Sequence, residues 1–263
     1  MTGTIVYSPH ATPDIGQVVL SNPGKLNAID VSMWHELREV FVQLQAIPAV
    51  SAPRAVIVSG SGGQFASGGD IHEFATFRFD EDALRHFHED IVAPALQAVL
   101  DCDIPLLAQI DGACIGGGLE IAACCDIRIC GTSSRFGAPI AKLGFPMAPG
   151  ELEILHRVVP GSVLREMLLE ARLLNAHRAF DVGLVHAVVE DGDVARRVLD
   201  RAEHVSELST EALRINKRSM RQLSQGGPDA VQRRAHFDYA PSAEHREGVM
   251  AFIEKRPPKF TPR

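Results

Sequence analysis

The stretch that decides the fold reads Asp111-Gly112-Ala113-Cys114-Ile115-Gly116-Gly117-Gly118-Leu119-Glu120. It follows the apolar run Pro105–Ile110, which is typical of a buried strand, and it opens a helix near Gly117. A second glycine-rich segment, Ser59–Asp70, follows another apolar run, Arg54–Ser59. Two successions of strand and glycine-rich loop predict a mixed α/β core.

Three familiar glycine-loop motifs fail on inspection. A dinucleotide-binding fingerprint built on Gly60 and Gly62 needs a third glycine where Phe65 stands. No Gly-Lys-Ser/Thr follows either loop, so neither is a P-loop. A nucleophile elbow around Ser61 needs glycine at position 59, which is Ser59.

What the two loops can supply is backbone N–H groups. Glycine lets a ligand approach the main chain closely, and a helix start leaves its first N–H groups unpaired with a partial positive charge. Two such groups directed at one carbonyl oxygen form an oxyanion hole. Glu120, on the first helical turn, could then act as a base. The other interpretation is that both loops are tight turns that pack helix on strand.

The rest of the chain divides into two parts. Ile15–Leu20 is strand-like, and Val31–Ala46 is helix-like with Asp30 as its N-cap. Glu81–Leu100 predicts a helix that is interrupted or kinked near Pro94. After Asp193 strand signals cease, and helical periodicity covers Val194–Glu207, Thr210–Leu223 and Ser242–Glu254. We therefore expect an α/β unit over residues 1–200 and a helical region over residues 201–263.

Composition excludes several classes of protein. With 263 residues, 46% hydrophobic and 22% charged, the chain is typical of a globular protein with a large core. A formal net charge of −7 does not favour a nucleic-acid partner. Five cysteines without Cys-x-x-Cys spacing indicate neither a metal site nor a disulfide framework. No targeting segment or membrane-spanning run is evident, so we expect a cytoplasmic protein.

The sequence resembles the crotonase superfamily, also called the enoyl-CoA hydratase/isomerase family, over nearly the whole chain. The matching segments occur in the family's order. They are Leu20–Ile29, Phe65–Ile71, Ile110–Glu120 with Cys125–Ile127, Ala171–Val189, Ala243–Gly248 and Phe252–Arg256.

The resemblance implies a crotonase-like spiral of ββα units with a C-terminal helical trimerisation region, assembled as a homotrimer or a dimer of trimers. It implies an acyl-CoA thioester substrate, with no permanently bound cofactor and coenzyme A entering as part of the substrate. The N–H groups of Gly69 and Gly117 would hold the thioester oxygen, and Glu120 would be the catalytic acid/base. The CoA itself would lie along Lys25, Leu26, Ser67, Gly68, Gly69, Asp70, Ile71, His72 and Gly117.

One position departs from the family's hydratases, which carry two catalytic glutamates. The first matches Glu120. The second follows a Phe-Gly-x-Pro segment, here Phe136–Pro139, and the next residue is Ile140, which cannot transfer a proton. The enolate-stabilising half of the site is intact, whereas water addition by two carboxylates is not implied.

Other polar residues allow two interpretations each. Glu151 either complements a helix N-terminus or replaces the missing carboxylate. His86 and His88, two positions apart on a helix, do not share a face, so we expect solvated side chains rather than metal ligands. Lys217, with Lys255 and Arg256, either pairs with CoA phosphates or lies on a solvated helix face.

We expect an acyl-CoA enzyme of the enoyl-CoA hydratase/isomerase type. The alternatives are other thioester chemistry on the same fold (decarboxylation, hydrolysis or C–C cleavage) and a non-catalytic acyl-CoA binding protein. Glu120 argues against the last, because a buried carboxylate beside an oxyanion site is costly unless it is used.

Overall fold

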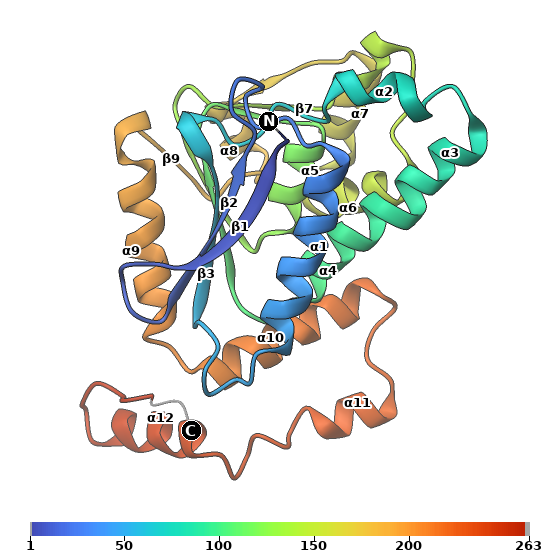
Figure 1. Ribbon diagram of the computed structural model, residues 1–263. Helices are drawn as coiled ribbons and strands as arrows, with labels where there is room; N and C mark the ends of the chain where they lie inside the picture. Colours follow the sequence, from blue (N-terminus) through green and yellow to red (C-terminus); the bar gives the residue numbers. More distant parts are fainter. Residues whose placement is uncertain (1, 261–263) are drawn as a thin grey trace.

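The computed structural model describes residues 2–260 and shows a mixed α/β fold (Figure 1). The larger sheet has the strand order β1-β2-β3-β4-β6-β9, in which only the β1–β2 pair is antiparallel. Its strands are β1 (Thr4–Pro9), β2 (Ile15–Ser21), β3 (Ala55–Gly60), β4 (Leu106–Ile110), β6 (Ile127–Gly131) and β9 (Ala187–Val189).

A smaller sheet of three short strands lies beside it, in the order β5-β7-β8. Its strands are β5 (Ala113–Ile115), β7 (Arg135–Gly137) and β8 (Leu174–Asn175). The β5–β7 pair is parallel and the β7–β8 pair is antiparallel. Strand β5 lies within the second glycine-rich segment, directly after β4.

Helices cover both faces of the large sheet. Those of the first half are α1 (Val31–Ala46), α2 (Ile71–Phe77), α3 (Glu81–His86), α4 (Ala93–Asp101) and α5 (Gly117–Cys124). Those of the second half are α6 (Pro149–Val158), α7 (Gly161–Leu169), α8 (Ala176–Asp181), α9 (Val194–Ser206), α10 (Thr210–Ser224), α11 (Ala230–Ala235) and α12 (Ala243–Ile253).

The alternation of side chains along the strands explains these layers. Val56 and Val58 of β3 face one way and join the main core, which includes α1, α4 and α5. Ala55 and Ile57 face the other way and pack on α9. Both faces of β3 are therefore buried, as its continuous apolar sequence predicts.

Helix starts and breaks follow the sequence. Helix α1 has the predicted bounds, and the Asp30 side chain accepts the Met33 N–H at 2.9 Å. The interruption expected near Pro94 is a π-helical turn, Phe87–Val92, that joins α3 to α4. Proline has no N–H to bond the carbonyl four residues earlier, and the Ala93 N–H bonds the carbonyl of His88, five residues back.

The C-terminal region is helical, as expected. Helix α9 runs through residue 200 and packs on the sheet through Val194, Val198 and Ala202, so by packing it lies with the core. Beyond it, α10 remains tied to the core by ion pairs, whereas α11 and α12 lie at the foot of the molecule (Figure 1). No helix within residues 2–260 is long and apolar enough to cross a membrane.

Candidate active site

The two glycine-rich loops lie side by side because short backbone ladders join them. Ala66 donates its N–H to the carbonyl of Ala113 at 2.9 Å, and Ile115 donates back to the carbonyl of Ala66 at 3.0 Å. Gly68 (φ 115°) and Gly116 (φ 50°, ψ −120°) adopt conformations that favour glycine, and the loops pass each other at this point.

Immediately after the crossing come the N–H groups of Gly69 and Gly117, and both residues line one pocket. Within residues 2–260 neither N–H has a hydrogen-bond acceptor, whereas the next N–H, that of Asp70, bonds Ile29 at 2.8 Å. A Cβ at position 117 would lie 2.9 Å from Trp34, and one at 69 would lie 3.1 Å from Phe74. Close packing therefore requires small residues where the two donors stand.

Glu120 projects into this pocket from the first turn of α5 and is buried. Burial, together with the negative charge of nearby Glu151, raises the pKa of Glu120 to about 8, and Arg78 opposes the rise. At neutral pH the protonated form therefore predominates. Such a group can deliver a proton to carbon, or take one as pH rises.

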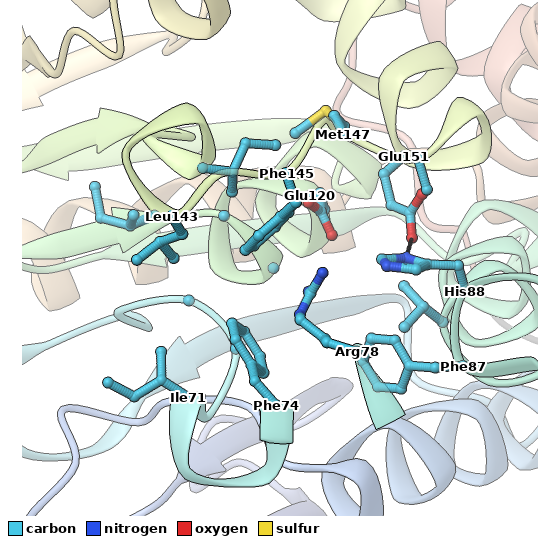
Figure 2. A pocket seen from close by; sticks show the side chains of 18 of the residues that line it. Ile71, Phe74, Arg78, Phe87, His88, Glu120, Leu143, Phe145, Met147 and Glu151 are labelled. Atoms are coloured by element: carbon cyan, nitrogen blue, oxygen red, sulfur yellow. Dashed lines mark hydrogen bonds and ion pairs between the residues drawn. The ribbon is translucent and has the colours of Figure 1, made fainter. Parts of the chain in front are cut away.

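A second carboxyl group, that of Glu151, enters the same pocket from the first turn of α6 (Figure 2). It is buried, and its Oε1 lies 2.7 Å from Nδ1 of His88. The expectation that His88 is solvated is therefore wrong: its side chain is 19% exposed and lines the pocket, whereas His86 is 65% exposed. The prediction assumed α-helical spacing, whereas His88 lies in a π-helical turn, which changes the direction of its side chain.

Ile140 lies in the pocket wall, where the motif comparison places the missing glutamate. The cavity is about 160 Å³ in volume and mainly apolar. Its apolar walls include Trp34, Phe74, Phe87, Val92, Leu143, Phe145 and Met147.

Sequence reasoning missed Arg78, which enters the pocket from the connection between α2 and α3 (Figure 2). Its guanidinium carbon lies 4.1 Å from the ring centroid of Phe74 and 3.7 Å from that of Phe145. The available signal was an arginine within an aromatic run, Phe74–Phe79, where ring faces can hold a guanidinium.

The residues expected along CoA divide into two groups. Ser67, Gly68, Gly69, Ile71 and Gly117 line the pocket. Lys25, Leu26, Asp70 and His72 do not line it and lie on neighbouring segments.

The Asp70 side chain is already engaged within the protein. It caps α2 by accepting the His72 N–H at 3.1 Å, and it pairs with Lys25 at 2.5 Å. Asp70 is 4% exposed and Lys25 is 39% exposed, so Lys25 is the member of the pair that solvent and a ligand can reach. Leu26 and Ile71 are exposed apolar side chains on the same two segments.

Lys217 has a structural role. Its Nζ lies 2.7 Å from a carboxylate oxygen of Asp126, donates to the carbonyl of Ile104 at 2.8 Å, and is buried. Arg256 pairs with Glu247 and Glu254. Within residues 2–260, no group of three or more His, Cys, Asp or Glu side chains is arranged to hold a metal ion.

Comparison with known proteins shows the family of the chain. Residues 11–263 match the enoyl-CoA hydratase/isomerase family. The chain belongs to the enoyl-CoA hydratase/isomerase family. A probable enoyl-CoA hydratase of Rhodobacter capsulatus is 32% identical over 250 residues, which cover 94% of each chain.

Two further relatives show the range of the family around this chain. A carnitinyl-CoA dehydratase of Proteus mirabilis is 32% identical over 93% of this chain and 94% of its own. The crystal structure of an enoyl-CoA hydratase/carnithine racemase from Magnetospirillum magneticum superimposes with a TM-score of 0.89 and 34% identity, covering 95% of this chain and 93% of that one. The protein is thus an acyl-CoA enzyme of the enoyl-CoA hydratase/isomerase family with the crotonase fold.

Proposed function

We propose that the enzyme holds the thioester carbonyl of an acyl-CoA with the N–H groups of Gly69 and Gly117 and so stabilises an enolate-like oxyanion. The observation that carries this proposal is the pair of N–H groups that have no acceptor within residues 2–260 and line the same pocket as a buried carboxyl group. The second donor begins α5, where the helix dipole adds positive potential. One such donor can contribute roughly a hundred- to a thousandfold in rate.

Glu120 is the proposed acid/base. When protonated it delivers a proton to the α-carbon of the enolate, and when ionised it removes one, while the oxyanion hole holds the negative charge on oxygen. The raised pKa makes both forms accessible near neutral pH. This single-carboxyl chemistry suffices for proton exchange and for a double-bond shift.

Water addition needs a second group to position and deprotonate the water that attacks the β-carbon. Ile140 cannot do so, and we propose that Glu151, held by His88, takes this role. Its buried carboxylate in the same cavity supports that assignment. The second candidate is catalysis by Glu120 alone, which the apolar side chain at position 140 favours.

The proposal extends to CoA and to assembly. CoA enters with the substrate and lies along Lys25, Leu26, Ser67–His72 and Gly117, of which the exposed Lys25, Leu26 and Ile71 are open to contact. Helices α11 and α12 and the connection between them expose large apolar side chains, which supports a homotrimer or dimer of trimers. Light scattering at micromolar concentration tests the assembly, and a stable monomer contradicts it.

A cytoplasmic site of action belongs to the same proposal. All five cysteines are buried and none forms a disulfide within residues 2–260, which suits a reducing compartment. Fractionation of cells that produce the protein tests it.

Deuterium exchange into butyryl-CoA, read by mass, tests the proposed chemistry. The substrate is saturated, so exchange requires only enolisation by the oxyanion hole and one base. Wild type should exchange the α-protons, and Glu120→Gln should lose the activity by a hundredfold or more. Glu153→Gln, an exposed carboxylate on α6, is the matched control and should exchange normally. Unimpaired exchange in Glu120→Gln contradicts the assignment.

A further inference from the structure

Arg78 is a charged side chain inside the pocket with no role in the proposed chemistry. Its guanidinium lies against the rings of Phe74 and Phe145, which contact each other edge to face with centroids 5.9 Å apart. Figure 2 shows the side chain extending into the cavity toward Glu120. The two rings contact the guanidinium, and Arg78 lines the cavity.

The charge of Arg78 has no partner within the described part of the chain. No carboxylate of residues 2–260 lies within 4.0 Å of its nitrogens, and its Nε is buried without a hydrogen-bond acceptor. Glu151 and Glu120 act on its charge only at longer range, and Glu151 is engaged with His88. By contrast, Arg85, on the next helix, pairs with both Glu81 and Asp82.

An arginine held this way matches one kind of ligand. Its planar fork binds a carboxylate through two parallel hydrogen bonds, and the geometry needs no reorganisation when the fork is already fixed. The neighbouring walls are apolar, so the pairing would take place with little water present. A neutral alkyl chain in the same cavity would leave a partly buried cation unsatisfied, which is costly.

We propose that the acyl group of the substrate carries a carboxylate at its far end, which binds Arg78, so that the enzyme acts on short ω-carboxyacyl-CoA thioesters. This inference rests on the proposed oxyanion hole and Glu120, which would process the thioester end of the same molecule. Arg78 is then a specificity-determining residue.

Two thioesters of equal chain length test the proposal: glutaconyl-CoA, which ends in a carboxylate, and trans-2-pentenoyl-CoA, which ends in a methyl group. Turnover is followed by mass, and binding of the saturated analogues glutaryl-CoA and pentanoyl-CoA by calorimetry. Wild type should prefer the acidic member in kcat/KM and in affinity by at least tenfold. Arg78→Met should lower both for the acidic member by roughly 10- to 100-fold and leave the neutral member unchanged or improved.

Two further variants separate specificity from other roles. Arg78→Lys keeps the charge but loses the fork and should fall between wild type and Arg78→Met. Arg85→Met removes an exposed, paired arginine and should change neither substrate. Thermal unfolding of each variant checks that the fold persists.

The outcomes distinguish the proposed role of Arg78 from the proposed chemistry of the oxyanion hole and Glu120. Equal affinity of wild type for glutaryl-CoA and pentanoyl-CoA overturns the role of Arg78 while leaving the oxyanion hole untouched. Equal losses for both thioesters in Arg78→Met, with a shifted pH profile, mean that Arg78 acts through Glu120 and also overturn it. If Glu120→Gln retains α-proton exchange, the proposed chemistry fails whatever Arg78 binds.

Discussion

Replacing Glu120 by Gln should stabilise the protein at alkaline pH while abolishing its activity. In the folded protein burial raises the pKa of Glu120 from its ordinary 4.5 to about 8. The folded state therefore binds the proton more tightly than the unfolded chain does. The stability that the protonated form contributes is fully present below pH 4.5 and is lost as pH rises through 8.

The size of the effect follows from the two pKa values. Each pH unit between them corresponds to about 1.4 kcal/mol, so complete ionisation of Glu120 costs the fold on the order of 3–5 kcal/mol. Glutamine is nearly isosteric with the protonated acid and has no such cost. The free energy of unfolding of Glu120→Gln should thus exceed that of wild type increasingly between pH 5 and pH 9.

Urea unfolding at pH 5, 7 and 9, at one fixed protomer concentration, measures this difference. Glu153→Gln is the control, because Glu153 is 66% exposed and pairs with the partly exposed Arg157. Its stability difference from wild type should stay small at every pH. If the difference between wild type and Glu120→Gln is the same at pH 5 and pH 9, the argument from burial is refuted.

Three further predictions concern the chemistry. Wild-type hydration of crotonyl-CoA should be weak, because Glu151 enters the pocket from α6 and not from the position that Ile140 occupies. Ile140→Glu should raise the rate at least tenfold, measured by loss of the enoyl absorbance. Hydration by wild type at hundreds of turnovers per second would show that Glu151 fully replaces a glutamate at position 140 and would refute this prediction. Glu151→Gln should abolish the hydration that wild type shows, and His88→Ala should weaken it because the Glu151 carboxyl group loses its partner at 2.7 Å. Unchanged hydration in both variants rejects the proposed role of Glu151. The rate of α-proton exchange into butyryl-CoA should rise with pH and level off above about 8, as Glu120 ionises; a rate that falls across this range contradicts its role as base.

Local patterns predicted most of the framework. Helix α1 begins and ends as its periodicity and the Asp30 cap indicate, and the buried strands follow their apolar runs within one residue. The two glycine-rich loops were also predictable, because each brings its backbone close to neighbouring backbone or side chains, which requires glycine. These features depend on residues near in sequence, so one chain suffices to find them.

The parts of the site that were missed depend on contacts between distant segments. His88 and Glu151 are 63 positions apart, and the π-helical turn that contains His88 changes which residues face inward. In the pocket, the Arg78 guanidinium contacts Phe145, which comes from a loop far along the chain, as well as the nearby Phe74. Neither the His88–Glu151 contact nor the Arg78–Phe145 contact has a local sequence pattern. Glu120 could be predicted because it directly follows its glycine-rich loop in the sequence.

The state of Glu120 links the fold to the proposed substrate. Its place on the first turn of α5 favours the ionised form, but a helix terminus contributes about 0.3–1 kcal/mol, against several kcal/mol from burial. The effect of burial on the pKa of Glu120 exceeds that of the helix terminus, so Glu120 is mainly neutral at pH 7 and does not repel an acidic acyl group. Glu151 has His88 beside it, and Arg78 is left as the cation without a partner among residues 2–260. A pocket with that balance of charge fits the proposed anionic chain end, and it keeps a protonated carboxyl group beside the proposed oxyanion hole.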